Sequence, residues 1–303
     1  MGGVKRRVLK FGGTSVGTAA ALRSTLQIAE AAVREAPVVL VVSALSGVTN
    51  QLEAAAGDAL ASRIDPAACA QTVRDRHLAL LGEVASGGAA RAAAVAVSRR
   101  ARELEARLAT IQVSAQLSAA SRAAVVALGE RLAAPVAAAA LRTLGIDAHA
   151  IDASDIVRTT QVYPEAQVDY GTTRRLAQAA LDALAPQAVP VVTGFIAAAP
   201  SGATTLLGRG GSDLTAAILG WALDAERVEI WSDVDGVMTD DPRRTLEART
   251  IPRLTYAEAA AMARAGAKVL HPRTLEPLEA PGIPVFVGNT MRPGAPGTWI
   301  GAV

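Results

Sequence analysis

Lysine is scarce in this chain, and its positions suggest a chemical role. Of the 30 basic residues only Lys5, Lys10 and Lys268 are lysines, and the rest are arginines. A lysine ammonium is a compact point charge, whereas the planar arginine guanidinium suits forked contacts with carboxylates. Lys10 and Lys268 stand close to glycines, in KFGGTSVG and GAKVLHP. We therefore interpret these two lysines as candidates for contacts with phosphate groups.

The segment KFGGTSVG, which begins at Lys10, has the composition of an anion-binding turn. Lys10 lies at the end of an apolar run, and Gly12 and Gly13 allow the backbone to approach a ligand closely. Thr14 and Ser15 can cap a following helix, whose free N–H groups attract anions. The lysine precedes the glycines, so the spacing is not that of a P-loop. An ordinary turn between a strand and a helix is the alternative.

Two further segments carry small hydroxyl and charged residues next to apolar runs. VVSALSGVTN contains Ser43, Ser46 and Thr49, whose hydroxyl groups can bind a polar ligand without filling a site. LGRGGSD contains three glycines together with Arg209, which can fork onto a carboxylate, and Asp213, which can organise nearby cations. Each segment could instead be a plain solvated turn.

The segment WSDVDGVMTDDPR contains four acids within nine residues, directly after an apolar run. It lacks EF-hand spacing, because there is no DxDxDG run and no glutamate at the required distance. Its acids could contact a ribose, water bound to Mg²⁺ or the edge of an adenine. The alternative is a capped acidic turn without a ligand.

Neither cysteine nor histidine occupies a recognisable catalytic motif. No cysteine motif surrounds Cys69, which favours a thiol that packs between helices, and a single cysteine cannot form an internal disulfide. His271 precedes a proline, which favours a structural turn. The absence of an internal disulfide suits the cytoplasm, where we expect the protein to reside.

Apolar runs alternate with helical segments, and this alternation predicts an α/β fold with a mainly parallel open sheet. We expect strands at 8–11, 38–43, 147–152, 189–195, 227–231 and 285–289. We expect helices at 19–35, 48–61, 91–111, 121–144 with a kink near Pro135, 174–184, 213–223 and 256–265. The stretch 197–204 is expected to be a flexible loop near a boundary between two lobes. Ligands should bind beyond the carboxyl ends of the strands.

The composition argues against nucleic acid and membrane partners. The net charge is +2 and no run of five like charges occurs, so a nucleic-acid-binding patch is a poor interpretation. The apolar stretch 133–144 is too short to cross a bilayer, and no targeting segment is visible. Hydrophobic residues make up 51% of the chain but aromatic residues only 3%, so aliphatic side chains must form the core.

The motifs together resemble the aspartate kinase branch of the amino acid kinase family. They are collinear and span nearly the whole chain, which makes the set far more specific than any single motif. The matching segments are KFGGTSVG (10–17), VVSALSGVTN (41–50), GER (129–131), GF (194–195), LGRGGSD (207–213), SDVDGVMTDDPR (232–243), GAKVLHP (266–272) and NTMRPGAPGTWI (289–300).

The resemblance implies one amino acid kinase domain over residues 1–303, built as a three-layer αβα sandwich. It implies an amino-terminal lobe of about 1–204 that binds the amino acid and a carboxyl-terminal lobe of about 205–303 that binds the nucleotide. The expected reaction transfers the γ-phosphoryl group of MgATP to the β-carboxylate of L-aspartate and yields 4-phospho-L-aspartate and ADP. A carboxylate is already ionised at pH 7, so this reaction needs no general base.

The resemblance also assigns roles to individual residues. The catalytic residues would be Lys10, Asp213 and Lys268. The substrate would be bound by Ser43, Thr49, Glu130, Phe195, Arg209 and Ser212. The nucleotide would be bound by Gly12, Gly13, Ser15, Ser232, Asp233, Met238, Arg243 and Lys268. Mg²⁺ would be held by the ATP phosphates, with no direct protein ligand.

The sequence departs from the family pattern at three positions and in its length. Ser232 stands where threonine is usual, Ala197 where glycine is common and Met238 where tyrosine is frequent. The two ACT modules that usually follow the kinase domain are absent, so we expect no feedback inhibition through a fused module. The alternatives are a homodimer formed by the kinase domain, a separate regulatory subunit, or a chain that is a fragment of a longer protein.

Two other functions are compatible with the same residues. One is a related kinase that phosphorylates a different amino or carboxylic acid, because a small change in a pocket can alter substrate choice. The other is a non-catalytic subunit that binds a nucleotide without turnover. The presence of Lys10, Arg209, Asp213 and Lys268 together disfavours the second.

Overall fold

The structure is a computed structural model, and it describes residues 5–161, 163, 166–240, 247–265 and 270–301. Among these residues eight strands form one sheet in the order β3-β4-β2-β1-β7-β9-β10-β8, and β5 and β6 form a separate hairpin. The strands are β1 (Arg7–Phe11), β2 (Val38–Val42), β3 (Ala148–Ile151), β4 (Val189–Thr193), β5 (Ile196–Ala198), β6 (Thr204–Leu206), β7 (Arg227–Ser232), β8 (Arg253–Leu254), β9 (Val285–Asn289) and β10 (Thr298–Ile300).

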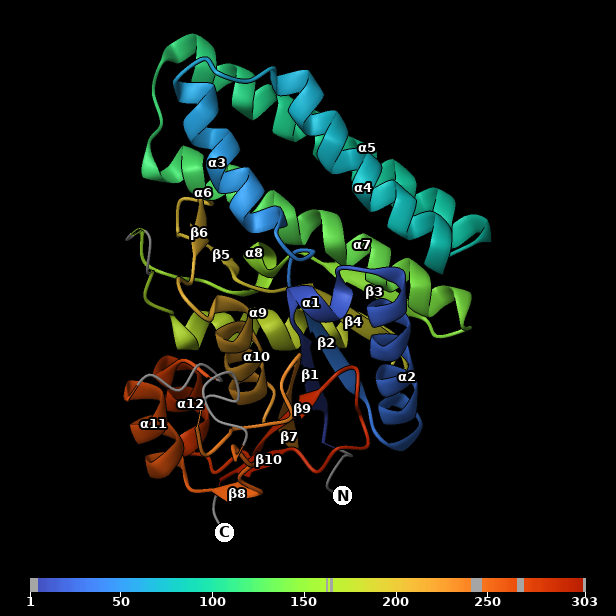
Figure 1. Ribbon diagram of the computed structural model, residues 1–303, viewed down its shortest axis with the longest axis vertical. Helices are drawn as coiled ribbons and strands as arrows, with labels where there is room; N and C mark the ends of the chain where they lie inside the picture. Colours follow the sequence, from blue (N-terminus) through green and yellow to red (C-terminus); the bar gives the residue numbers. More distant parts are fainter. Residues whose placement is uncertain (1–4, 162, 164–165, 241–246, 266–269, 302–303) are drawn as a thin grey trace.

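Parallel pairing dominates the large sheet. Every neighbouring pair in it is parallel except β9 and β10. The helices that connect these strands cover both of its faces, as Figure 1 shows. They are α1 (Gly13–Val16), α2 (Ala19–Glu35), α3 (Val48–Leu60), α4 (Pro66–Val84), α5 (Gly87–Ser114), α6 (Ala119–Val126), α7 (Leu128–Thr143), α8 (Ala153–Ile156), α9 (Tyr170–Asp182), α10 (Gly211–Ala222), α11 (Tyr256–Arg264) and α12 (Pro272–Glu279).

The alternation of side chains along the central strands builds two cores. Leu9 and Phe11 of β1 join a core that contains side chains of α2, α3, α4, α5 and α7. Val8 of the same strand joins the opposite core, with α6, α8, α9, α10, α11 and α12. Lys10 has the parity of Val8, so its side chain leaves the sheet on the α10 face. The predicted three-layer αβα architecture is confirmed.

Most predicted elements agree with the structure and two of them differ, while α4 and α12 were not predicted. The expected flexible loop 197–204 is mostly the hairpin of β5 and β6, in which Ala197 is fully buried. The helix expected at 121–144 breaks at Ala127, not at Pro135, which lies inside α7. Nearly all of α7 is buried, so its packing offsets the one hydrogen bond that a proline removes.

The division into two lobes stays a prediction. The sheet runs without interruption across the proposed boundary near residue 204, because β1 pairs with β2 on one side and with β7 on the other. The hairpin β5–β6 lies at this boundary. Both proposed lobes therefore contribute strands to one continuous sheet.

Among the described residues, one helical stretch is both long and strongly apolar. Residues Ala119–Thr143 are long and apolar enough to cross a membrane by length and composition, with a mean hydropathy of 1.6. This stretch is longer than the segment 133–144 considered from sequence. Its most apolar part is 94% buried inside the fold, so the side chains of α6 and α7 supply the core.

Two glycines inside helices offer opposite tests of this packing. A Cβ at Gly220 of α10 would lie 2.5 Å from Val228 Cγ2 of β7, whereas nothing lies within 4 Å of a Cβ at Gly57 of α3. We expect Gly220→Ala to lower the free energy of unfolding by about 1–3 kcal/mol, because α10 must move away from the sheet. We expect Gly57→Ala to raise it by about 0.5–1 kcal/mol. Urea denaturation measures both, and equal effects would contradict this packing.

Candidate active site

The loops at the centre of the sheet form a crevice. From β1 the chain continues to β2 on one side, while β7 lies on the other, so the order of connection reverses at β1. A crevice for a ligand is expected at such a point, beyond the carboxyl ends of the strands. The glycine turn follows β1 here, and the Gly12 N–H donates to the carbonyl oxygen of Trp231 at 3.1 Å.

Gly13 brings the glycine turn against the loop that follows β2. A Cβ at Gly13 would lie 2.8 Å from the carbonyl oxygen of Ala44 and 3.3 Å from the nitrogen of Ser46. The Ser46 N–H donates to the carbonyl oxygen of Gly13 at 3.1 Å. A side chain at position 13 would separate the two loops, so this glycine is needed for their close approach.

Lys10 and Asp213 form a largely buried ion pair at the base of the crevice. Lys10 Nζ lies 2.5 Å from Asp213 Oδ1, and the two side chains are 9% and 14% exposed. Lys10 is the next-to-last residue of β1, and Asp213 lies in the first turn of α10, where a carboxylate is favoured by the helix dipole. The pair therefore joins residues that are about 200 positions apart in the sequence.

A cavity of about 440 Å³ opens around this ion pair. It contains eight of the site residues proposed from sequence, namely Lys10, Gly13, Ser43, Thr49, Glu130, Phe195, Ser212 and Asp213. The remainder of its lining consists of Thr14, Ala44, Leu45, Ser46, Gly47, Asn50, Gly208, Gly210 and Gly211. One cation, two acids and small hydroxyl groups from four separate segments thus meet in one space.

Glu130 presents a buried carboxyl group to the cavity from the first turn of α7. The residue is 2% exposed, and its Oε1 accepts from the Ala44 N–H at 3.2 Å. Its Oε2 has no hydrogen-bond partner among the described residues. Burial raises the pKa of Glu130 to about 8, although the Ala44 N–H opposes the shift. A cationic ligand group would supply the missing partner for Oε2.

The first turn of α10 is fixed by close contacts with the backbone that follows β4. A Cβ at Gly194 would lie 2.6 Å from Ser212 Oγ, so only glycine leaves room for this side chain. Phe195 has a left-handed backbone, with φ of 68°, and its N–H donates to Thr215 Oγ1 at 2.9 Å. Such a conformation is strained for a bulky residue, and residues of this kind are concentrated at functional sites.

Three of the proposed nucleotide-binding residues are joined at the β7 side of the crevice. Gly12 is hydrogen-bonded to Trp231, the next-to-last residue of β7, as described above. Ser15 Oγ is buried and lies 2.7 Å from Thr290 Oγ1, and the Thr290 N–H donates to the carbonyl oxygen of Ser232 at 2.8 Å. In this arrangement the Ser15 side chain holds the loops together instead of lining the cavity.

Other candidates lie away from the cavity or outside the described residues. Asp233 is exposed, and Met238 Sδ accepts from Thr250 Oγ1 at 3.4 Å. Arg209 is exposed between Gly208 and Gly210 and does not line the cavity, although both glycines do. The candidates Arg243 and Lys268 lie outside the described residues.

The described residues offer no direct ligand set for a metal ion. No group of three or more histidine, cysteine, aspartate or glutamate side chains is placed to hold one. Asp213, the acid at the base of the cavity, is paired with Lys10. The idea that Mg²⁺ is held by ATP phosphates stays a proposal.

Sequence reasoning missed several contributors to the site. Arg76 of α4 donates from Nη2 to the carbonyl oxygen of Ser46 at 2.7 Å, which ties the loop after β2 to the helical layer. A Cβ at Gly210 would lie 2.9 Å from His271 Cβ, so His271 supports the glycine turn before α10. No pattern marked Arg76, because α4 itself was not predicted. The GF segment, by contrast, had already signalled Gly194.

Comparison with known proteins places the chain in a family. A family model described as the amino acid kinase family matches residues 5–289. The chain belongs to the amino acid kinase family. The chain is also 35% identical to aspartokinase 1, chloroplastic, of Arabidopsis thaliana, over 97% of this chain and 51% of that protein. It is 36% identical to lysine-sensitive aspartokinase 3 of Escherichia coli, over 97% of this chain and 63% of that protein.

A solved structure extends the likeness to the backbone of this amino acid kinase. The E. coli aspartokinase III complex with aspartate and ADP, in its R-state, superimposes with a TM-score of 0.87 and 33% identity. The superposition covers 98% of this chain and 64% of that one. The chain therefore spans about half to just under two thirds of the length of these relatives. The family resemblance inferred from the motifs is confirmed.

The raised pKa of Glu130 makes a prediction about stability. The folded state keeps its proton up to about pH 8, whereas an unfolded glutamate releases it near pH 4.5. Stability contributed by the protonated group is complete below about pH 4.5 and is lost as the pH rises to about 8. We therefore expect Glu130→Gln, relative to wild type, to gain stability across this interval, by an amount on the order of a few kcal/mol.

Urea denaturation at pH 5, 7 and 9 measures the difference between the variant and wild type. Glu105→Gln on the exposed side of α5 is the control, and its difference should not vary with pH. A pH-independent difference for Glu130→Gln would contradict the burial argument.

Proposed function

We propose that this amino acid kinase is an aspartate kinase, which transfers the γ-phosphoryl group of ATP to the β-carboxylate of L-aspartate. The observation that supports this most is that the Lys10–Asp213 pair and the buried, unpartnered Oε2 of Glu130 lie in the lining of one cavity. A phosphoryl-transfer site for an amino acid needs a cation near the phosphate and an acid for the substrate ammonium. Lys10 and Glu130, which both line the cavity of about 440 Å³, would supply these two groups.

The relatives support the same substrate. Both relatives named above are aspartokinases, and the E. coli structure contains aspartate and ADP. The residues that line the cavity come from motifs shared with that branch of the family. The resulting product would be 4-phospho-L-aspartate, and ADP would be released.

The proposed reaction is an in-line displacement that balances without proton transfer. An oxygen of the β-carboxylate attacks the γ-phosphorus and forms a new O–P bond. The bond from that phosphorus to the bridging oxygen breaks, and its electron pair leaves with ADP. The β-carboxylate is ionised at neutral pH, so the protein has to position the reactants and offset negative charge. Lys10 would offset charge on the transferring group, and Asp213 would hold the lysine ammonium in place.

The proposed substrate contacts follow from the cavity lining. Glu130 would ionise to receive the substrate ammonium, since pairing with a cation stabilises its charged form. Ser43, Thr49 and Ser212 would donate to or accept from the polar groups of the substrate. Arg209 would have to turn from its exposed position to grip the α-carboxylate. Phe195 would close the apolar side of the pocket.

The nucleotide would lie toward β7. Gly12, Gly13 and the segment that begins at Ser232 would contact it, with Asp233, Met238, Arg243 and Lys268 in the roles that the resemblance implies. Mg²⁺ would arrive with the ATP phosphates. A cytoplasmic location, a homodimer through the kinase domain and a separate regulatory subunit remain predictions.

Removing the Lys10 ammonium should abolish turnover. We expect Lys10→Ala to lower kcat at least about 100-fold, because one group that stabilises transition-state charge is lost. The substitution also leaves Asp213 buried without its cation, which costs stability. A coupled ADP-release assay and thermal unfolding together measure both effects.

The double variant Lys10→Ala/Asp213→Ala serves as the control. It should recover most of the lost stability, because no unpaired charge remains, but should not recover turnover. Near-normal turnover in either variant would contradict the assignment of Lys10.

A panel of acids distinguishes the proposed substrate from related ones. We expect ADP release to be fastest with L-aspartate and at least about tenfold slower with L-glutamate or N-acetyl-L-glutamate, since each adds atoms that the site must accommodate. Turnover tenfold faster on another acid would identify a different acid kinase. Tight ATP binding without turnover on any acid would identify a non-catalytic subunit.

A further inference from the structure

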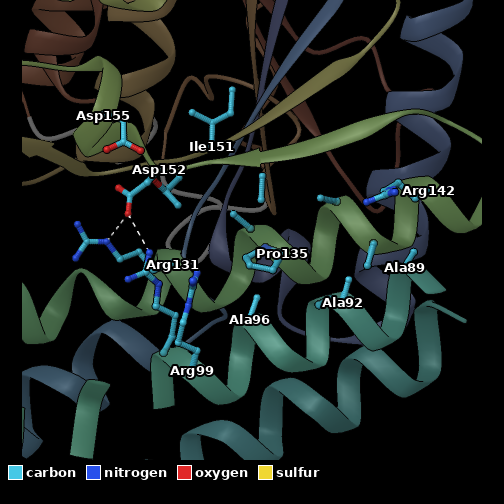
Figure 2. Close-up of a pocket in the computed structure, with 17 residues that line it drawn as sticks. Ala89, Ala92, Ala96, Arg99, Arg131, Pro135, Arg142, Ile151, Asp152 and Asp155 are labelled. Atoms are coloured by element: carbon cyan, nitrogen blue, oxygen red, sulfur yellow. Dashed lines mark hydrogen bonds and ion pairs between the residues drawn. The ribbon is translucent and has the colours of Figure 1, made fainter. Parts of the chain in front are cut away.

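A second cavity, of about 390 Å³, lies against α7 beside the candidate active site. Consecutive residues of α7 line the two spaces, since Glu130 contributes to the first cavity and Arg131 to the second. The second cavity lies between α5, α7 and the carboxyl ends of β3 and β4, as Figure 2 shows. The edge formed by the strand ends is where parallel sheets commonly bind ligands.

Small apolar residues leave the middle of this cavity open. The antiparallel helices α5 and α7 contribute mainly alanines to its lining, and these short side chains leave the groove unfilled. The apolar lining consists of Ala89, Ala92, Ala93, Ala96, Ala134, Pro135, Ala138, Ala139, Ala150 and Ile151. The volume is within the usual range for small-molecule sites, which are mainly apolar with a few polar groups.

One end of the cavity is a fixed polar network. Arg131 is 8% exposed, and its Nε donates to Asp152 Oδ2 at 2.6 Å while its Nη2 donates to Ser154 Oγ at 3.2 Å. Arg100 Nη2 lies 3.5 Å from Asp152 Oδ2. The Thr193 hydroxyl oxygen accepts from the Ala153 N–H, and its hydrogen has no acceptor among the described residues. These groups form a polar end of the cavity, at which the Thr193 hydroxyl is free to donate a hydrogen bond.

Two further arginines in the lining have no ion pair or side-chain hydrogen bond among the described residues: Arg99 and Arg142. Figure 2 shows Arg142 close to Ala89, and Arg99 at the other end, below Arg131. From Arg131 to Arg142 helix α7 advances eleven residue steps, which rise roughly 17 Å and separate the two ends. The lining contains four arginines and two aspartates, so its charge is positive at both ends.

We propose that this cavity binds an elongated organic anion with an apolar middle and an anionic group at each end. One group would be held by Arg99 with the polar end of the cavity, and the other by Arg142. The alanines would contact the apolar middle. Guanidinium groups form forked contacts with carboxylates and phosphates, which suits both ends.

The position of Arg142 also has a simpler explanation that needs no ligand, and the experiment must distinguish the two. This residue also lies in the last turn of α7, where a cation is favourable without any ligand. The two explanations differ in whether a bound molecule uses Arg99 and Arg142 at once. Both side chains are exposed, so replacing them should leave the fold intact.

A series of α,ω-dicarboxylates from succinate to sebacate provides the test. Their affinities are measured by isothermal titration calorimetry at constant ionic strength. L-aspartate and ADP are present at saturating concentrations. We expect affinity to rise to a maximum at an intermediate chain length and to exceed that of the monocarboxylate of equal length. Arg142→Ala should lower the affinity of the best dicarboxylate about tenfold, to the level of the monocarboxylate, because one charged contact is lost. Arg99→Ala should do the same.

Arg91→Ala is the matched control. Arg91 is exposed on α5, the helix that also carries Arg99, and the variant should bind like wild type. A parallel series of alkyl bisphosphates shows whether phosphate or carboxylate ends are preferred. Binding of neither series at millimolar concentrations would overturn the proposal. So would an equal loss in Arg91→Ala, or the absence of any advantage of two anionic ends over one.

Discussion

An ion pair between the end of the first strand and the start of a late helix sets the geometry of the site. Lys10 and Asp213 come from β1 and α10, and their contact requires both elements to be held firmly. The alternation of side chains along β1 directs Lys10 toward α10. The core residues between α10 and the sheet fix the distance of this helix from the sheet. A largely buried pair of this kind is costly to expose or to break. The surrounding loops therefore assemble around two charges whose positions the fold determines.

Close backbone contacts bring the remaining groups to those charges. Gly13 and Gly194 allow neighbouring segments to approach to distances that any side chain would prevent. Phe195 adopts a left-handed backbone at a cost of about 1–2 kcal/mol for a bulky residue. Its N–H bond to Thr215 and the bond from the Leu207 N–H to its carbonyl oxygen hold it there. The site thus combines a rigid base with a locally strained wall.

The sequence predicted the layers of the fold and most of the cavity lining. Apolar runs rich in β-branched residues located the central strands. The helix at 19–35 was predicted with the observed bounds. The predictions were weakest where tertiary packing overrides local preference. Pro135 suggested a kink, yet burial of α7 keeps the helix intact there. The stretch around Gly202 looked like a loop, but pairing of β5 and β6 orders its flanks. The start of α4 could have been predicted, because Asp65 and Pro66 form a helix-start signal.

Residues that hold distant loops together were beyond sequence reasoning. Arg76 contributes by a bond to a main-chain oxygen of a distant loop, and no composition or spacing marks such a contact. Ser15 was expected to face a ligand, but its hydroxyl is used between two loops. A side chain's chemistry suggests its partners only when the partner is also a side chain with a recognisable pattern.

The position of α7 between the two cavities also limits how the chain can change in length. Neighbouring residues on a helix point about 100° apart, which is why Glu130 and Arg131 serve different spaces. Ala127 is the one residue between α6 and α7, and its deletion would move every residue of α7 to the preceding position if the helix backbone kept its place. An arginine would then occupy the position of the buried acid, and the charge of the cavity wall would reverse. Insertions and deletions should therefore be tolerated far less at this position than in surface loops.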